Sequence, residues 1–433
     1  MGLRESLRVG ASGLLFGMLM SSSGCGGGSS SQSVSPPPNS APSTSAPPAV
    51  LKAYAAGSVV NPSLVTADND LGLNLLNTLL ASNTGNENVA IAPVSVAIAL
   101  QVVYNGAKGA SQQAMDQTLQ LGAMSTDDLN AANAALQASL LNPDPNVHIT
   151  LANSLWLHLA DNPVNPNFTQ TDTTYYGATV GDLSGAPDNI NAWVAAQTHG
   201  LITAILPPES PNYYQSVIAF IANVVYFKGP WTTAFPVDQT VQTPFTRSDG
   251  TQVASQMMNQ TGTFGYLRGS NFQALRLPYG QGVLSMLIVL PDTGVDLDSL
   301  MAGLSGTTVS GWVAGLQDTV VDVGLPRFTA TFSATLVPAL SSLGMGAAFC
   351  PSPQVDFSGI APLACISDVE HETLVQVDES GTVAAGASGV TVGTGAVELS
   401  VPMTMNHPFL YFIRDDATGA LLFAGVLRDP TAT

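Results

Sequence analysis

The stretch Val377–Leu399 reads V-D-E-S-G-T-V-A-A-G-A-S-G-V-T-V-G-T-G-A-V-E-L, and it contains no charged residue from Ser380 to Val397. A run of Gly, Ala, Ser, Thr and Val is typical of a flexible linker. Here, however, the apolar segments M-T-M-N-H-P-F-L-Y-F-I and L-L-F-A-G-V-L follow almost at once. The small and β-branched residues therefore indicate either a low-complexity loop or a segment that can enter a sheet as a strand, and the neighbouring residues decide between the two. Four small residues at alternate positions would share one face of that strand: Thr382, Ala384, Gly386 and Ser388.

The residues on both sides of this stretch resemble the serpin family. H-E-T-L-V-Q-V-D-E-S-G-T-V-A-A-G-A-S resembles the serpin strand and proximal hinge, and N-H-P-F-L-Y-F-I-R-D-D-A-T-G-A-L-L-F-A-G-V-L-R-D-P resembles the C-terminal signature. Further segments occur in the family's order, among them I-A-P-V-S-V-A-I-A-L-Q-V-V-Y-N-G-A-K-G, F-I-A-N-V-V-Y-F-K-G-P-W and L-S-M-L-I-V-L-P-D. Together they extend the resemblance over nearly all of the chain after residue 60.

Periodicity predicts helices early in the chain and mostly antiparallel strands later, which indicates an α+β fold. The predicted helices span residues 71–80, 94–104, 111–119 and 190–201, and the predicted strands span 217–227, 272–277, 284–290, 320–323 and 373–377. The resemblance implies the serpin fold, in which helices pack on three mostly antiparallel β-sheets and a reactive-centre loop is exposed.

The first residues are typical of an exported protein. Arg4 and Arg8 precede a short apolar core, which predicts a signal peptide over residues 1–24. S-S-G-C-G-G-G resembles a bacterial lipoprotein cleavage site with Cys25 as the lipidated residue, although Ser22 stands where an aliphatic residue is usual. Lipidation is favoured over ordinary cleavage. We expect a disordered Gly/Ser/Pro tether over residues 25–50 and a serpin domain over 51–433, either anchored at the cell surface or periplasm or extracellular.

Composition limits the class of partner. The chain has 30 acidic and 11 basic residues, and the resulting net charge of −19 argues against nucleic acid as a partner and against contact with membranes other than through a lipid. We expect a monomer. The sequence leaves open whether Cys350 and Cys365 pair or remain free thiols.

No motif for catalysis, a cofactor or a metal is present. The chain lacks G-x-S-x-G, H-E-x-x-H and a P-loop, its D-T-G at Asp292 has no second copy, and its five His show no metal-ligand spacing. We therefore expect no enzyme activity and no cofactor.

The resemblance assigns site residues one by one. The breach, where the loop first enters the sheet, corresponds to Trp231, Arg327 and Glu379. The shutter, a polar cluster below the sheet centre, corresponds to Ser95, Asn223 and His371, while Ala92 replaces a second Ser of the family. The hinge corresponds to Glu379, Ser380, Gly381, Thr382, Val383, Ala384, Ala385, Gly386, Ala387 and Ser388.

The resemblance implies a suicide substrate that traps a serine protease in a covalent complex. Counting from the hinge places the reactive carbonyl at Gly395, whereas counting back from His407 places it near Val397. Ala396 and Val397 favour an elastase-like target, a subtilisin-like target is the alternative, and the absence of Arg and Lys disfavours a trypsin-like one. The rival interpretation is a non-inhibitory serpin that acts as a surface binding or chaperone-like protein.

Overall fold

The computed structural model describes residues 59–83, 85–141, 144–207, 214, 217–382 and 399–432. All of them belong to one of two compact units of the chain, Thr44–Thr433. The predicted signal peptide, the tether with Cys25, hinge residues 383–388 and the reactive-bond residues 395–397 lie outside the described residues. Within the described ranges, no helix combines the length and apolarity that crossing a membrane requires.

The helices are mostly in the first half of the chain. They are α2 (Pro62–Ser82), α3 (Pro93–Tyr104), α4 (Gly109–Thr118), α5 (Thr126–Leu140), α6 (Pro166–Tyr175), α7 (Asp188–Gln197), α9 (Leu297–Met301), α10 (Gly306–Ala314) and α11 (Val337–Ser342). Asn61 caps α2, because its side chain accepts a 2.9 Å hydrogen bond from the Ser63 N–H while Pro62 begins the helix. The predicted helix 190–201 ends earlier than expected, since His199 and Gly200 adopt positive φ angles of 53° and 78°.

The strands form two sheets. The first has the order β10 (Phe328–Thr335), β11 (Ile366–Asp378), β12 (Gly381–Thr382), β4 (Ala219–Pro230), β2 (His148–Leu157) and β3 (Thr179–Asp182). The second has the order β1 (Val89–Ile91), β15 (Leu421–Leu427), β14 (Phe409–Asp415), β8 (Leu284–Pro291), β7 (Phe272–Tyr279), β6 (Gln252–Arg268), β9 (Gln317–Pro326) and β13 (Val401–Thr404), with β5 (Val241–Thr246) paired to β6.

The predicted α+β class is confirmed. Four of the five predicted strands lie within longer observed ones, and the fifth, 217–227, begins two residues before β4. The three sheets implied by the resemblance are joined by hydrogen bonds into two. The cause is the 17-residue strand β6, which pairs with β5, β9 and β7 at successive parts of its length. Because β6 is long enough to pair with strands of two of the expected sheets, it joins those two sheets into one.

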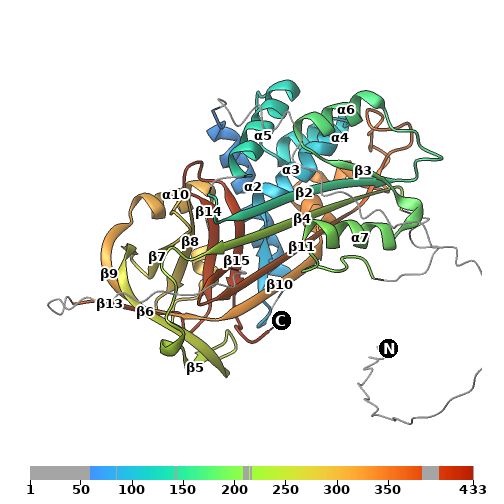
Figure 1. Cartoon of the computed structure of the whole chain (residues 1–433). Coiled ribbons are helices and arrows are strands. Elements are labelled where there is room, and N and C mark those ends of the chain that lie inside the picture. Colours follow the sequence, from blue (N-terminus) through green and yellow to red (C-terminus); the bar gives the residue numbers. More distant parts are fainter. Residues whose placement is uncertain are drawn as a thin grey trace, which may run out of the picture. The chain divides into compact units, whose positions relative to one another are not determined.

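The strand β4, at the centre of the first sheet, is buried on both faces. Figure 1 shows α2 and α3 on one side of β4 and α7 on the other. Alternate residues of β4 accordingly belong to two apolar clusters. Those on the α3 side are Ala219, Ile221, Val225 and Phe227. Those packed with Ile190 and Val194 of α7 are Phe220, Ala222 and Val224.

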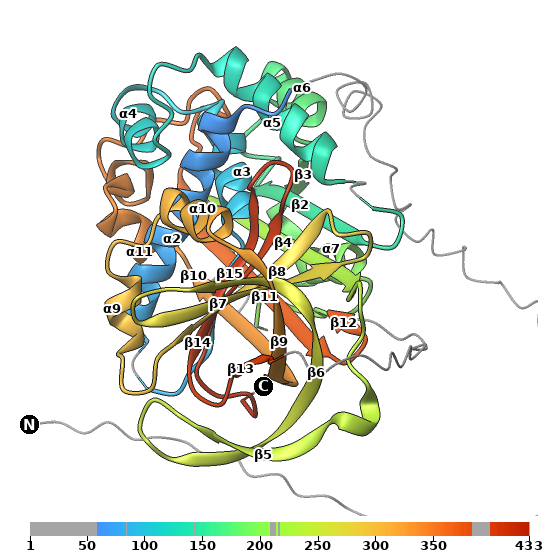
Figure 2. The same ribbon diagram turned by 90° about the vertical axis from the view of Figure 1, so that its left-hand side faces the viewer.

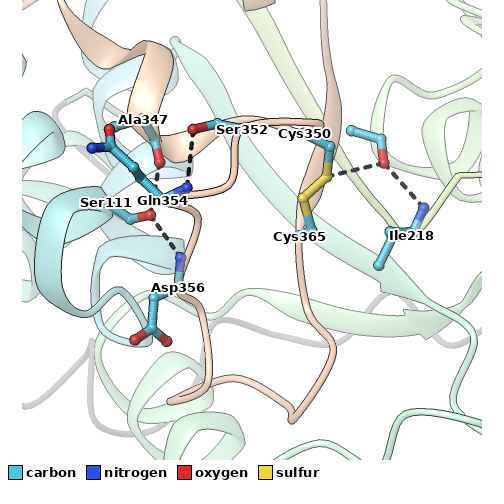
Figure 3. The surroundings of a disulfide bond; sticks show 9 residues. Ser111, Ile218, Ala347, Cys350, Ser352, Gln354, Asp356 and Cys365 are labelled. Atoms are coloured by element: carbon cyan, nitrogen blue, oxygen red, sulfur yellow. Dashed lines mark hydrogen bonds between the residues drawn. A yellow bond between two sulfur atoms is a disulfide. The ribbon is translucent and has the colours of Figure 1, made fainter.

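Cys350 and Cys365 form a disulfide, with their Cα atoms 5.9 Å apart, so the pairing that the sequence left open is present. The bond lies directly before β11 (Figure 3). The Cys350 N–H donates to the Ile366 carbonyl at 3.0 Å, and the Ser367 hydroxyl contacts Cys350 Sγ at 3.8 Å. The same hydroxyl accepts a 3.1 Å bond from the Ile218 N–H, just ahead of β4. The disulfide thus fastens the start of β11 beside the start of β4.

Replacing both cysteines (Cys350→Ser with Cys365→Ser) should lower the free energy of unfolding by about 3 kcal/mol, because cross-linking residues 15 positions apart restricts the unfolded chain by about that amount. Urea unfolding with and without a dithiol reductant measures the effect. The reductant should bring the parent chain to the stability of the variant and leave the variant unchanged. Equal midpoints for parent and variant would contradict this expectation.

Candidate functional site

The centre of the first sheet contains a gap between two parallel strands. β11 and β4 pair directly from Ile366 with Ala219 as far as Glu372 with Val224. Beyond that pair, the two-residue strand β12 lies between them and is antiparallel to both. Figure 2 shows β12 as a short strand near the end of β11. The sheet is therefore closed at one end and already separated by one strand at the other.

The gap keeps a single register along its length. At the open end, Thr382 of β12 pairs with Val377 of β11 and with Gly229 of β4. The residue numbers of these two partners, Val377 and Gly229, differ by 148. At the closed end, His371 pairs with Asn223, and the difference is again 148. Because the offset is unchanged, a strand continuing from β12 would meet both neighbours in register without a bulge.

Two hinge residues are fixed by their surroundings. Gly381 has φ +149°, and a Cβ there would fall against the Gly229 carbonyl and Pro230 Cα, so no other residue fits. Thr382 is 1% exposed, and its hydroxyl lies 2.7 Å from the Tyr279 hydroxyl. Tyr279 in turn stacks on Trp231, with ring centroids 4.5 Å apart. The Thr382 side chain is thus buried, and its hydroxyl has a polar partner on the stacked aromatic pair.

The turn between β11 and β12 is held by an ion pair and by backbone bonds. Both carboxylate oxygens of Glu379 accept from Arg327 Nε, at 2.7 and 2.6 Å, and the Thr240 hydroxyl donates to one of them at 2.5 Å. Burial raises the pKa of Glu379, but the hydrogen bonds from Arg327 and Thr240 outweigh it and the net shift is downward. Trp231 donates from its indole to the Asp378 carbonyl at 3.0 Å and from its backbone to the Ser380 carbonyl at 2.9 Å. The three predicted breach residues thus meet around this turn.

The predicted shutter residues meet at the closed end of the gap. The Asn223 amide donates to Asn153 Oδ1 at 2.7 Å and to the Ser95 carbonyl at 2.9 Å, with the Ser95 hydroxyl 2.5 Å away. Its oxygen accepts from His371 Nδ1 at 2.9 Å. Because His371 Nε2 accepts a 3.1 Å bond from the Ala92 N–H, the ring must be neutral with its proton on Nδ1. Burial lowers the pKa of His371 to about 3, consistent with that neutral form.

Sequence reasoning missed several members of both clusters. Asn153 accepts a hydrogen bond from Asn223, and the Tyr279 hydroxyl lies within hydrogen-bond distance of the Thr382 hydroxyl. Thr240 donates a hydrogen bond to Glu379. Asp378 Oδ1 shapes the turn by accepting from the Ser380 N–H at 2.8 Å. None lies in a segment of the quoted hinge or shutter motifs except Asp378. Ala92, which replaces a Ser of the family, contributes its backbone N–H to the shutter.

This arrangement can accept a further strand between β11 and β4 at the open end of the gap. At the closed end it can release the hydrogen bond between His371 and Asn223, which we call the latch. In the described part of the chain, no three His, Cys, Asp or Glu side chains gather as metal ligands.

Comparison with known proteins gives a consistent result. A family model described as "Serpin (serine protease inhibitor)" matches residues 66–430. An uncharacterized serpin-like protein of Thermococcus kodakarensis is 34% identical, over 81% of this chain and 82% of its own length. The leukocyte elastase inhibitor of Xenopus laevis is 32% identical, over 80% of this chain and 94% of its own. The crystal structure of tengpin, a thermophilic serpin in the native state, superposes with a TM-score of 0.78 at 25% identity, covering 86% of this chain and 96% of tengpin.

Breaking the ion pair at the turn should destabilise the protein. Arg327→Ala should cost about 2 kcal/mol in urea unfolding, because the nearly buried Glu379 carboxylate loses its charged donor; the 42% exposure of Arg327 keeps the loss at this low end. Arg268→Ala, which breaks the more exposed pair with Asp292, should cost less than about 1 kcal/mol. Adding Glu379→Gln to Arg327→Ala should recover part of the loss. Equal costs for the two arginines would contradict the importance of the turn.

Acid should destabilise the shutter. The unfolded state protonates His371 near pH 6.5, whereas the folded state resists until about pH 3, so this residue's stabilisation is present above pH 6.5 and is lost as the pH falls toward 3. The loss should be about 1.4 kcal/mol per pH unit. Urea midpoints at pH 7, 6, 5 and 4 should therefore fall more steeply for the parent chain than for His371→Gln. Parallel curves would show that His371 is not buried in its neutral form.

Proposed function

This chain belongs to the serpin family, whose members are generally protease inhibitors, and from that premise we propose that it inhibits serine endopeptidases as a suicide substrate. The segment after Thr382 would be presented to the protease as an extended peptide. The protease serine would attack the reactive carbonyl, the peptide C–N bond would break, and the new amine would leave with a proton from the protease histidine. Insertion of the freed segment between β11 and β4, a known property of serpins, would then displace the attached protease before water cleaves the acyl ester.

The observation that carries this proposal is the position of β12 between β11 and β4. Extending its register pairs Ala384 with Val375 and Phe227, and Gly386 with Thr373 and Val225. Val375 is fully buried and Phe227 nearly so. A side chain facing inward must therefore be small and uncharged, as the quoted sequence is at these positions.

The same register takes Ser388 to the shutter, between His371 and Asn223. Insertion past this point would separate these two residues and break their 2.9 Å hydrogen bond. The Ser388 hydroxyl is able to donate and accept, so it would provide a substitute partner for both. This coincidence of a hydroxyl with the latch supports insertion at least as far as Ser388.

For the target we propose an elastase-like protease, with a subtilisin-like one as the second choice. Ala396 and Val397 suit a small apolar specificity pocket, and one similar protein, that of Xenopus laevis, is named leukocyte elastase inhibitor. The reactive carbonyl would be Gly395 by the count from the hinge. We further propose that the protein is exported and tethered by lipid on Cys25, through residues 25–50.

The full chain should first be mixed with pancreatic elastase and with subtilisin. A band of summed mass that survives denaturing electrophoresis supports covalent trapping, and the N-terminus of the released peptide distinguishes cleavage after Gly395 from cleavage after Val397. Cleavage without such a band requires a melting curve of the cut chain. A much higher melting temperature means that the loop inserts and another protease is the target. An unchanged one overturns the proposal in favour of a non-inhibitory binding protein.

Two neighbouring substitutions provide a matched test of insertion. Ala384→Glu would bury a carboxylate against Val375 and Phe227, so it should convert inhibition into plain cleavage, with at least a tenfold loss of trapped complex. Val383→Glu would instead face outward, between Gln376 and Lys228, and should trap protease as the parent chain does. Quantifying the stable band against the cleaved chain measures both. Equal trapping by the two variants would contradict the register.

A further inference from the structure

A buried polar cluster lies between α2, α3, α5 and α6, away from the gap in the sheet. Gln101 Nε2 donates to Asp68 Oδ1 at 2.8 Å, joining α3 to α2. The Tyr176 hydroxyl, just beyond α6, donates to Asn130 Oδ1 of α5 at 2.7 Å. Only Asn105, at the end of α3, is more than a few per cent exposed. We call this set the interhelical cluster, and its members are Asp68, Gln101, Asn105, Asn130, Asn133, Asp172 and Tyr176.

The interhelical cluster has more acceptors than donors. Five of its buried oxygens have no hydrogen-bond partner: Asp68 Oδ2, Gln101 Oε1, Asn133 Oδ1 and both carboxyl oxygens of Asp172. Buried acceptors without donors are costly, and isolated buried carboxylates are more so. The sequences of α2, α3, α5 and α6 contain no Lys, Arg or His. These four helices therefore offer no cationic side chain to balance either acid.

We propose that Asp68 and Asp172 are neutral carboxylic acids in the native protein, and that Asp68 and Gln101 form a two-bond acid–amide pair joining α2 to α3. The bond from Gln101 Nε2 to Asp68 Oδ1 is one half of this pair. A proton on Asp68 Oδ2 that donates to Gln101 Oε1 completes it and gives two of the five unpartnered oxygens a partner. A proton on Asp172 likewise removes a charge that the neighbouring Asn105 amide offsets only in part.

The electrostatics of the surrounding elements support this assignment. Burial raises the pKa of Asp68 to about 8, and Gln101 of α3 offsets only part of the effect. Burial raises the pKa of Asp172 to about 9, again only partly offset by the Asn105 amide. The third titratable group is Tyr176, whose pKa is raised by burial and then by Asp172 and Asp68. The remaining members, from α3 and α5, are amides and do not titrate.

The acid–amide pair acts on the same helix that holds the shutter. α3 is buried along its whole length, with Ser95 near its start against Asn223 and Gln101 in its second half against Asp68. Ionising Asp68 at alkaline pH leaves a buried carboxylate facing an amide oxygen and loosens α3. If insertion occurs as proposed above, conversion to the inserted form becomes faster at alkaline pH. Only this consequence, and not the assignment of neutral acids, rests on the proposed function.

Proton release on unfolding tests the assignment directly. At pH 6.5 an unfolded Asp is ionised, so each neutral acid in the native chain should release about one proton when the chain unfolds. Guanidinium unfolding in weak buffer with an indicator dye counts these protons. Relative to the parent chain, Asp68→Asn should release about one proton fewer, and Asp68→Asn with Asp172→Asn about two fewer. Protons from Glu370 and Glu372, whose pKa values burial raises to about 8 and about 7, cancel in these differences.

The matched control is Asp249→Asn. Hydrogen bonds from Thr251 lower the pKa of this exposed acid to about 2, so it is ionised in both states and the number of released protons should not change. Infrared difference spectra provide a second measurement if the Asn variants do not fold. They are recorded on Glu370→Gln with Glu372→Gln, which removes the two other acids with raised pKa values. They should contain a protonated-carboxyl C=O band that disappears above pH 9.

Two results would overturn the assignment. One is a proton count that Asp68→Asn leaves unchanged, together with no protonated-carboxyl band. The other is an unfolding midpoint that rises with added Na⁺ or Ca²⁺ and collapses in Asp68→Asn at every pH, which would mean that ionised acids hold a cation. Neither measurement uses a protease, so failure to trap elastase leaves this inference standing, and its own failure leaves the proposed inhibition intact.

Discussion

The hydrogen bond between His371 and Asn223 is the interaction on which the rest of the first sheet depends. It joins β11 to β4 at the last stretch where these strands pair directly, and its 2.9 Å length and complete burial leave water no access. An unsatisfied buried partner costs about 1–3 kcal/mol. Under the proposed insertion, further separation of the sheet therefore costs less when the incoming strand replaces the lost bond. In that mechanism the polarity of one inserted residue matters as well as the size of the others.

The open end of the gap imposes a different constraint, which is steric. At Gly381 the chain passes so close to β4 that a Cβ would meet backbone atoms, and the next side chain, Thr382, fills a pocket closed by Tyr279. The two residues of β12 therefore have a fixed direction and register. Glu379 and Trp231 hold the turn that precedes them. A strand that continued from Thr382, as proposed above, would keep this register. Steric fit at one end and polarity at the other together define what the gap accepts.

The sequence predicted the part of this site that lies in local motifs. His371, Asn223, Ser95, Trp231 and Arg327 each stand in a recognisable segment, and the structure brings them into two clusters. Tyr279 was missed because its partner Thr382 is 103 positions away and P-Y-G indicates only a turn. α5 was missed because its buried face carries amides among the alanines and leucines, which conceals the apolar periodicity: Asn130, Asn133 and Gln137. The number of sheets was not predicted correctly because it depends on the length of β6. The alternation of polar and apolar residues in β6 does not show where the strand begins and ends.

Those same amides connect the fold to its charge balance. A chain with 30 acidic and 11 basic residues has few cations for its interior, and the described helices α2 to α6 have none. A buried acid in such a region is compatible with folding only as a neutral group, since an isolated carboxylate costs more than packing returns. Amides suit this role because they both donate to and accept from a carboxylic acid. The acidic composition thus affects how the helices beneath the sheet are held together, and it makes α3, which contributes Ser95 to the shutter, sensitive to pH.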